Sequence, residues 1–306
     1  MVLPPGSGGA GGRGARAEHG RGLTGSPSRR ISNLSRRPRP RLISVRAACA
    51  SLAVSLALAE ISPAQAPEGK QVYQDHCAVC HGPNGDGNGE AAARLQTKPA
   101  DFTAGRYKFR STRSGAVPTD EDLLATLVRG VRGTAMVPQR HLALPELRAV
   151  VAYLKTLSPR FAEPGSPPVP VPPAPGVTPE LVARGVRLYR ASGCPECHGD
   201  GGKGDGPSAR KGMKDARDLP ILPADLSRRP LKRGADPRET WKSIALGLDG
   251  TPMPSYADAL EPGEIWALVL FLESLATPDR RDPEDRLLPG EEALGEQIER
   301  EHRGRH

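Results

Sequence analysis

One pentapeptide pattern occurs twice in this chain of 306 residues, with cysteine at its first and fourth positions and histidine at its fifth. The copies are Cys77-Ala78-Val79-Cys80-His81 and Cys194-Pro195-Glu196-Cys197-His198. Residues three and four apart share one face of a helical turn, so both thiols can bond to the two vinyl groups of one porphyrin while the histidine reaches its iron. Each copy therefore predicts a covalently attached haem c, and the chain is predicted to carry two.

The same cysteine pairs are also compatible with a zinc site or a disulfide. A zinc site needs a second ligand pair nearby, but the two cysteine pairs lie 117 residues apart. The fifth cysteine, Cys49, belongs to an N-terminal segment that we expect to be removed. Covalent haem is thus the interpretation that uses all four remaining cysteines and leaves no free thiol to act as a nucleophile.

A repeated distance predicts the second ligand of each iron. Met136 follows His81 by 55 residues and Met253 follows His198 by 55 residues, within Gly133-Thr134-Ala135-Met136 and Gly250-Thr251-Pro252-Met253. A methionine is more often a flexible core filler, but beyond the initiator the only other one is Met213, which stands in a lysine-flanked segment and has no counterpart in the first half. The predicted iron ligands are His81, Met136, His198 and Met253.

These motifs make the chain resemble a dihaem c-type cytochrome built from two class I cytochrome c modules. The resemblance runs from about Gly69 to Ala276 and implies an all-α fold with two tandem domains, residues 67–160 and 178–277. A proline-rich linker, 161–177, joins them and is expected to be a semi-rigid polyproline II spacer of at most about 50 Å.

The resemblance also assigns roles to particular residues. Pro99 and Pro223 are the candidates for a carbonyl that accepts the second N–H of each iron-binding histidine. Gly69 and Gly185 are expected to let the first and last helices of each module cross closely, and the expected aromatic partners are Tyr153 and Phe271.

Local patterns predict the helices of each module. Short amphipathic helices precede the two cysteine motifs, at 70–73 and 183–189, and each module ends on another, at 147–157 and 265–275. Thr119, followed by three acidic residues, is a predicted N-cap. Val137 separates Met136 from Pro138, whereas Pro254 follows Met253 directly, so the first methionine loop is expected to differ slightly.

Residues 1–66 are predicted to be a basic leader and signal peptide. An apolar run at 47–59 is too short to span a bilayer, and Ala64-Gln65-Ala66 offers a cleavage site near Ala66. The basic segment before the apolar run is either a genuine n-region of the signal peptide or the result of a start codon assigned too far upstream, with translation beginning nearer Val45. An organellar transit peptide is the alternative interpretation of the whole leader. We expect a periplasmic protein with no transmembrane helix in the mature chain.

The net charge of +8 belongs to the leader. Residues 1–66 hold ten arginines and two glutamates, and the remaining chain has 33 basic and 33 acidic residues, which argues against a nucleic-acid partner. Residues 67–160 carry 13 basic and nine acidic side chains. This excess either forms a mildly basic face that docks a partner or is scattered over the solvated surface. Residues 278–306 form a charged tail with a predicted helix at 291–300, either a solvated appendage or a partner-binding element.

The predicted function is electron transfer. A thioether ligand favours reduced iron, and an iron with both axial positions filled has no vacancy for a substrate. The expected partners are therefore redox proteins. The chain would meet them either as a soluble shuttle or as a subunit of a membrane oxidase, dehydrogenase or reductase complex. The alternative is a dihaem enzyme of the peroxidase or thiosulfate-oxidising type, in which one haem loses its methionine.

Overall fold

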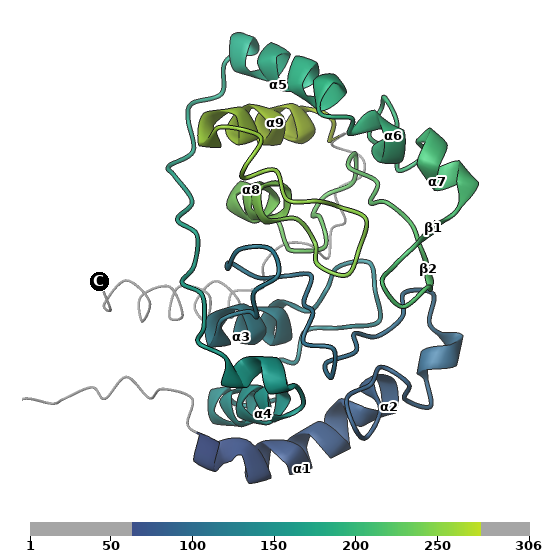
Figure 1. Cartoon of the computed structure of the whole chain (residues 1–306), viewed down its shortest axis with the longest axis vertical. Helices are drawn as coiled ribbons and strands as arrows, with labels where there is room; N and C mark the ends of the chain where they lie inside the picture. The colour runs from purple at the N-terminus through teal and green to yellow at the C-terminus, as the bar shows by residue number, and fades with distance from the viewer. Residues whose placement is uncertain (1–62, 277–306) are drawn as a thin grey trace, which may run out of the picture. The chain divides into compact units, whose positions relative to one another are not determined.

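The computed structural model describes residues 63–276, which all belong to one compact unit of the chain. The leader up to residue 62, including Cys49, and the tail from residue 277 lie outside the described residues. The described part is mostly helical, with one two-stranded antiparallel pair, which confirms the predicted all-α fold of two tandem modules (Figure 1).

The first module holds four α-helices and three short 3-10 turns. The turns are η1 (Pro63–Gln65), η2 (Ala92–Arg94) and η3 (Pro159–Ala162), and the helices are α1 (Ala66–His76), α2 (Ala78–His81), α3 (Asp120–Arg129) and α4 (Leu144–Thr156). Thr119 caps α3 as predicted, because its hydroxyl accepts a bond from the Asp122 amide while the Asp122 carboxylate accepts one from the Thr119 amide.

The second module repeats the order of the four main helices, with a further short helix and two short strands between the second and third of them. Its helices are α5 (Pro179–Ala191), α6 (Pro195–His198), α7 (Pro207–Lys211), α8 (Pro237–Leu246) and α9 (Pro262–Ser274), and its strands are β1 (Met213–Lys214) and β2 (Pro220–Ile221). Met213 pairs with Ile221 and Lys214 with Pro220.

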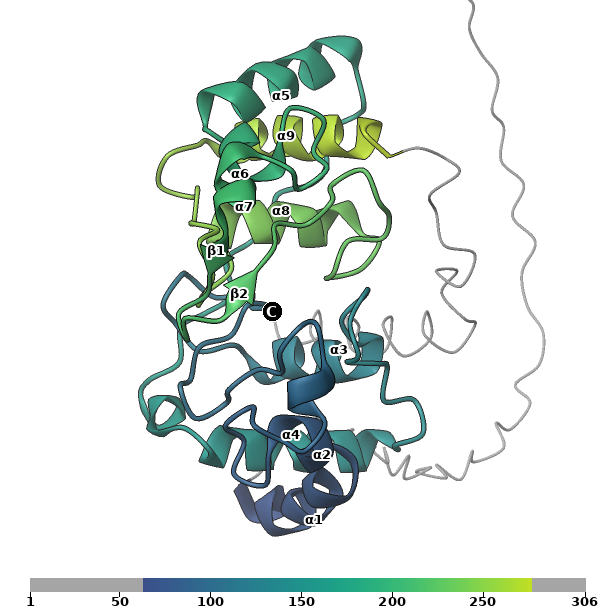
Figure 2. The same cartoon turned by 90° about the vertical axis from the view of Figure 1, so that its right-hand side faces the viewer.

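In each module the first and last long helices cross at a glycine. A Cβ on Gly69 would lie 1.8 Å from the Ala149 carbonyl oxygen, and one on Gly185 would lie 2.1 Å from that of Ala267. The crossing of α1 with α4 and of α5 with α9 is visible at opposite ends of Figure 2. The predicted crossing glycines are therefore confirmed.

The predicted aromatic partners lie at the same crossings. The ring of Tyr153 is 5.1 Å from that of Tyr73, and the ring of Phe271 is 5.2 Å from that of Tyr189. Each module buries its own cluster of apolar side chains around such a pair, so the described region contains two separate cores.

The linker has no helix or strand between residues 164 and 178, but it is not a free spacer. Val169 and Val171 pack against the core of the second module, and the indole of Trp266 donates to the Pro172 carbonyl at 3.1 Å. At the other side, the Val169 amide donates to the Ser111 carbonyl of the first module at 2.8 Å. The extended segment is thus bonded to both modules.

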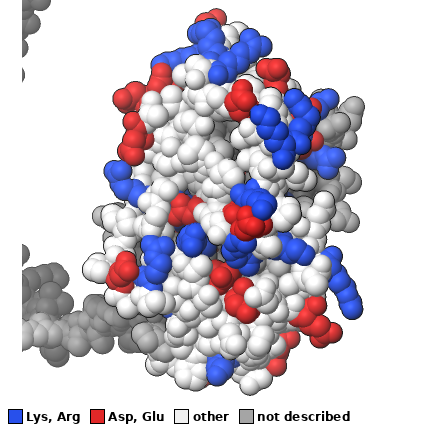
Figure 3. Space-filling model, turned by 45° about the vertical axis from the view of Figure 1, so that its right-hand side comes forward, with Lys and Arg blue, Asp and Glu red and all other residues white. Residues whose placement is uncertain are grey.

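Among residues 63–276, no helix has the length and apolar content that crossing a membrane requires. The face drawn in Figure 3 shows basic and acidic side chains mixed over a largely uncharged surface. That face therefore carries no extended patch of a single sign.

Candidate haem sites

Each cysteine motif forms the single helical turn that its spacing predicts. The His81 amide donates to the Cys77 carbonyl and the His198 amide to the Cys194 carbonyl, both at 2.9 Å. A glycine at positive φ ends each turn, Gly82 at 78° and Gly199 at 76°. The four cysteines are half-buried and none forms a disulfide. Both thiols and the imidazole of each motif are thereby held on one short turn.

A buried tyrosine anchors each turn from the preceding helix. The hydroxyl of Tyr73 donates to the Gly82 carbonyl and that of Tyr189 to the Gly199 carbonyl, each at 2.7 Å. These bonds satisfy a carbonyl at the end of each turn that has no intrahelical partner. Their repetition shows that the two modules position their motifs in the same way.

The carbonyl that fixes each histidine is not the predicted one. The Nδ1 atom of His81 lies 3.1 Å from the Ala100 oxygen, and that of His198 lies 3.0 Å from the Ala224 oxygen. The prediction of Pro99 and Pro223 was wrong by one residue, because the carbonyl after each proline faces the ring. Burial lowers the pKa of both histidines, which keeps each imidazole neutral with Nδ1 donating and Nε2 available for a metal.

A cavity opens beside each histidine. The first has a volume of about 280 Å³ and the second about 200 Å³. The first is lined by Cys80, His81 and Met136, and the second by Cys194, Cys197, His198 and Met253. Every predicted haem ligand except Cys77 therefore lines the cavity of its own module. Met213 also lines the second cavity, so position alone does not single out Met253.

The two methionine loops make the same hydrogen bonds. In the first, the Val131 amide donates to the Met136 carbonyl at 2.7 Å, and the Met136 amide donates to the Thr134 hydroxyl at 3.1 Å. In the second, the corresponding distances are 3.1 Å from Leu248 to Met253 and 3.1 Å from Met253 to Thr251. The threonine of the repeated Gly-Thr-x-Met pattern thus orients the methionine backbone. The expected difference at Val137 leaves these bonds unchanged.

Each cavity is completed by residues of the other module, which sequence reasoning missed. Arg217, Lys232 and Asp249 of the second module line the first cavity, whereas Lys108 and Phe109 of the first module line the second. The Arg217 guanidinium also donates to the Pro99 carbonyl at 2.8 Å, beside His81. The two sites are therefore walled by one interface.

A length difference between the copies was the available signal for this interface. Pro223 follows His198 by 25 positions, but Pro99 follows His81 by only 18, so the second copy has seven extra residues there. Thr119 follows Asp101 by 18 positions and Asp236 follows Asp225 by only 11, so the first copy has seven extra residues later. Two of the interface contacts come from these places, those of Arg217 in the second copy and of the segment at 110–115 in the first.

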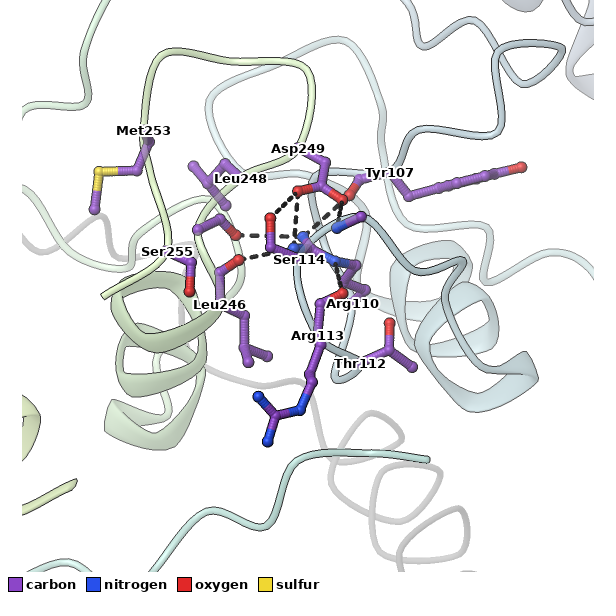
Figure 4. A network of polar contacts seen from close by, with 12 residues as sticks. Tyr107, Arg110, Thr112, Arg113, Ser114, Leu246, Leu248, Asp249, Met253 and Ser255 are labelled. Atoms are coloured by element: carbon purple, nitrogen blue, oxygen red, sulfur yellow. Dashed lines mark hydrogen bonds and ion pairs between the residues drawn. The ribbon is translucent and has the colours of Figure 1, made fainter. Parts of the chain in front are cut away.

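Arg110 is the centre of the contact made by the first module (Figure 4). Its side chain is fully buried and its Nη2 atom lies 2.8 Å from the Asp249 carboxylate and 2.7 Å from the Leu246 carbonyl oxygen. Ser114 and Gly115 donate to the same carboxylate, each at 2.9 Å. The segment at 110–115 of the first module therefore binds the second module at Leu246 and Asp249, where α8 ends and the loop that carries Met253 begins.

Comparison with known proteins shows the family to which the chain belongs. The cytochrome c family model matches residues 66–158 and again 182–276, so the chain belongs to the cytochrome c family and has two such modules. It is 25% identical over 208 residues to the cbb3-type cytochrome c oxidase subunit FixP of Azorhizobium caulinodans, a match that covers 68% of this chain and 59% of that protein. The chain thus spans less than two thirds of this relative's length.

A solved structure gives a second similarity. A chain of the reducing HAO-like protein complex of Kuenenia stuttgartiensis is 38% identical and superimposes with a TM-score of 0.69, over 72% of this chain and all of that one. Two cytochrome c modules with two such cysteine motifs define a dihaem cytochrome c, which confirms the predicted pair of covalent haem c groups and the electron-transfer class of function.

The residues of the first cavity fit a porphyrin. The apolar side chains of Phe102, Leu123 and Leu127 line it together with the histidine and the methionine. The buried hydroxyl of Tyr107, another lining residue, has no hydrogen-bond partner among residues 63–276. A buried hydroxyl without a partner is costly, so it marks a place where a polar group of the cofactor belongs.

Proposed function

We propose that His81 with Met136 and His198 with Met253 are the axial ligands of the two haem irons, and that the protein passes single electrons between partner proteins in the periplasm. The observation that carries the proposal is the repetition of the whole ligand set. A neutral imidazole held by a carbonyl and a methionine held by a threonine hydroxyl border each of the two cavities. When attached, each haem supplies an iron that gains and loses one electron.

The chain's own residues account for the remaining requirements of an electron carrier. The bond from Nδ1 to the Ala100 or Ala224 carbonyl fixes the ring orientation and makes the other nitrogen a stronger ligand. The larger part of each cavity's lining surface is apolar, which would limit how much solvent reorganises when the charge of the iron changes. An iron held by both a histidine and a methionine of this chain would have no place for a substrate to coordinate.

Membership of a respiratory complex is the form of partnership that the relatives support. One relative is named as an oxidase subunit and the other as part of a multiprotein complex. We propose that this chain likewise donates to or accepts from a larger redox assembly, rather than only diffusing as a shuttle. Size-exclusion chromatography of native extract, followed by haem staining, tests this, since a shuttle elutes at its own mass.

The ligand assignment is tested by near-infrared absorption of the oxidised protein, where each bond from methionine sulfur to Fe(III) gives a charge-transfer band. We expect two equivalents of the band in the wild type, and one after Met136→Ala or Met253→Ala. Met213→Ala is the matched control, because Met213 lines the second cavity without being a proposed ligand.

Two other outcomes are informative. Loss of a band in Met213→Ala with retention in Met253→Ala would show that Met213 is the ligand of the second iron. A wild type with only one equivalent would favour the alternative of a dihaem enzyme with one open iron, and turnover of peroxide or thiosulfate would then be the assay.

A further inference from the structure

Two lysines occupy the same position in the two modules and meet at the interface. Lys108 lies seven residues after Asp101 of Pro99-Ala100-Asp101, and Lys232 lies seven residues after Asp225 of Pro223-Ala224-Asp225. Both side chains line the first cavity and both also line the second. The repeat therefore brings one equivalent lysine from each module to a wall that both cavities share.

The ammonium groups of these lysines are partly withdrawn from water and form no ion pair among the described residues. Both residues are half-buried, and neither Nζ makes a hydrogen bond or an ion pair with any of residues 63–276. Burial lowers the pKa of both, and for Lys108 the positive charges of Lys232 and Arg217 lower it further, against an opposing effect of Asp215. Placing two like charges together in a half-buried wall is unfavourable unless anionic groups are added.

Two other positive side chains near the wall already have partners. Arg233 bonds to Glu239 at 2.7 Å and lies over the ring of Phe109, 5.7 Å from its centroid. Arg217 donates to the Pro99 carbonyl. Lys98 and Arg106 line the first cavity alone. Lys108 and Lys232 are therefore the cations available to anions entering either cavity.

A haem is an apolar disc whose periphery carries two carboxylates, so each occupied cavity brings two anionic groups. We propose that Lys108 and Lys232 together bind haem carboxylates of both cavities, so that one pair of charges sets the reduction potentials of both haems. This inference rests on the proposed function, since it requires two haems that are reduced reversibly. It makes the two modules a single coupled redox unit rather than two carriers on one chain.

The coupling has a definite sign. A positive charge near an iron favours its reduced form, because reduction adds an electron to the site. Removing either lysine charge should therefore lower both reduction potentials. For two unit charges about 10 Å apart, Coulomb's law gives roughly a twofold change in an equilibrium constant at the dielectric constant of water and about a fifteenfold change at an effective value of about 20.

The test is spectroelectrochemical titration of the full-length holoprotein and of the variants Lys108→Met and Lys232→Met. We expect each substitution to reduce the equilibrium constant of reduction at both haems by about threefold or more, where tenfold corresponds to about 59 mV for one electron. Lys70→Met in α1 and Lys211→Met in α7 are matched controls, because both lysines are exposed and line neither cavity. Lys108→Arg and Lys232→Arg keep the charge and should restore most of the wild-type potential.

Several outcomes would overturn the inference. One is a shift at only the haem of the lysine's own module, and another is a shift no larger than in the controls. A third is a shift that disappears at about 0.5 M salt, since screening of that kind belongs to exposed charges. If a methionine variant fails to mature, Lys108→Gln and Lys232→Gln remove the same charge from a polar side chain and serve in its place.

The same titration separates the inference from the proposed function. A wild type with two reversible one-electron steps and variants that match it would contradict the lysine pair alone. A wild type without two such steps would contradict electron carriage itself.

Discussion

Replacing Arg110 by methionine should break a buried ion pair between the two modules. The guanidinium of Arg110 is fully buried and is shared between the Asp249 carboxylate at 2.8 Å and the carbonyl oxygens of Leu246 at 2.7 Å and Gly247 at 3.4 Å. Methionine fills a similar volume but donates no hydrogen bond. The variant would leave the carboxylate of Asp249, whose side chain is only 12% exposed, without its counter-ion.

The magnitude follows from this geometry. Removing one partner of a buried ion pair typically costs about 3–5 kcal/mol, because the other charge stays buried. Here Asp249 keeps its bonds from Ser114 and Gly115, so we expect the lower end, a loss of about 3 kcal/mol in the free energy of unfolding. The control Arg113→Met should change it by less than about 0.5 kcal/mol, because the Arg113 side chain is 74% exposed and lies 4.0 Å from the exposed Asp258.

The assay is urea unfolding of the holoprotein, followed by circular dichroism and by the near-infrared methionine bands. Two modules need not unfold together, so separating the two signals is part of the measurement. Since Arg110 holds the start of the loop that carries Met253, we expect the band of the second haem to be lost at lower urea than in the wild type. The reasoning is refuted if Arg110→Met and Arg113→Met unfold alike, or if the band of the first haem is the one that weakens.

Two further predictions concern pH and helix crossing. Burial would raise the pKa of Glu239, but the positive charges of Arg233, Lys242 and Arg129 outweigh this effect and lower the pKa to about 2. The stability that this carboxylate contributes is therefore present above about pH 4.5 and is lost as the pH falls towards 2, by about 3 kcal/mol at most. In a measurement of unfolding free energy against pH, Glu239→Gln should flatten the profile over this range. Gly185→Ala places a Cβ 2.1 Å from a carbonyl oxygen of α9, so we expect it to reduce the free energy of unfolding by about 2 kcal/mol or more and to lower the melting temperature. The control is Gly201→Ala, which has open space around it and should leave the melting temperature unchanged.

The features that repeat in the sequence were predictable, because repetition marks positions with a common role. The turns of the cysteine motifs, the crossing glycines and the placement of Met136 and Met253 at the cavities all follow from local patterns within a module, whereas the role of these methionines as iron ligands stays a prediction. The structure also shows why the histidine partner was missed by one residue. The direction of a carbonyl in the Pro-Ala-Asp turn depends on backbone angles that residue types alone do not specify.

The interface between the modules was not predictable in the same way. Arg110 and Arg217 come from places where the two copies differ in length, and each reaches the other module only because distant segments pack together. A fully buried arginine and a half-buried lysine look the same in a sequence as exposed ones. The signal in the sequence was that each copy has seven extra residues at a different place, which indicates segments that contact something outside their own module.

The reciprocal lining of the two cavities has a consequence for biogenesis. The residues of the second module that line the first cavity lie between positions 215 and 250, so they follow the whole first module along the chain. A nascent polypeptide that has emerged only as far as the linker therefore presents its first cofactor pocket with one side open to water. The wall of that pocket is complete only after the second module has been made and has packed against the first.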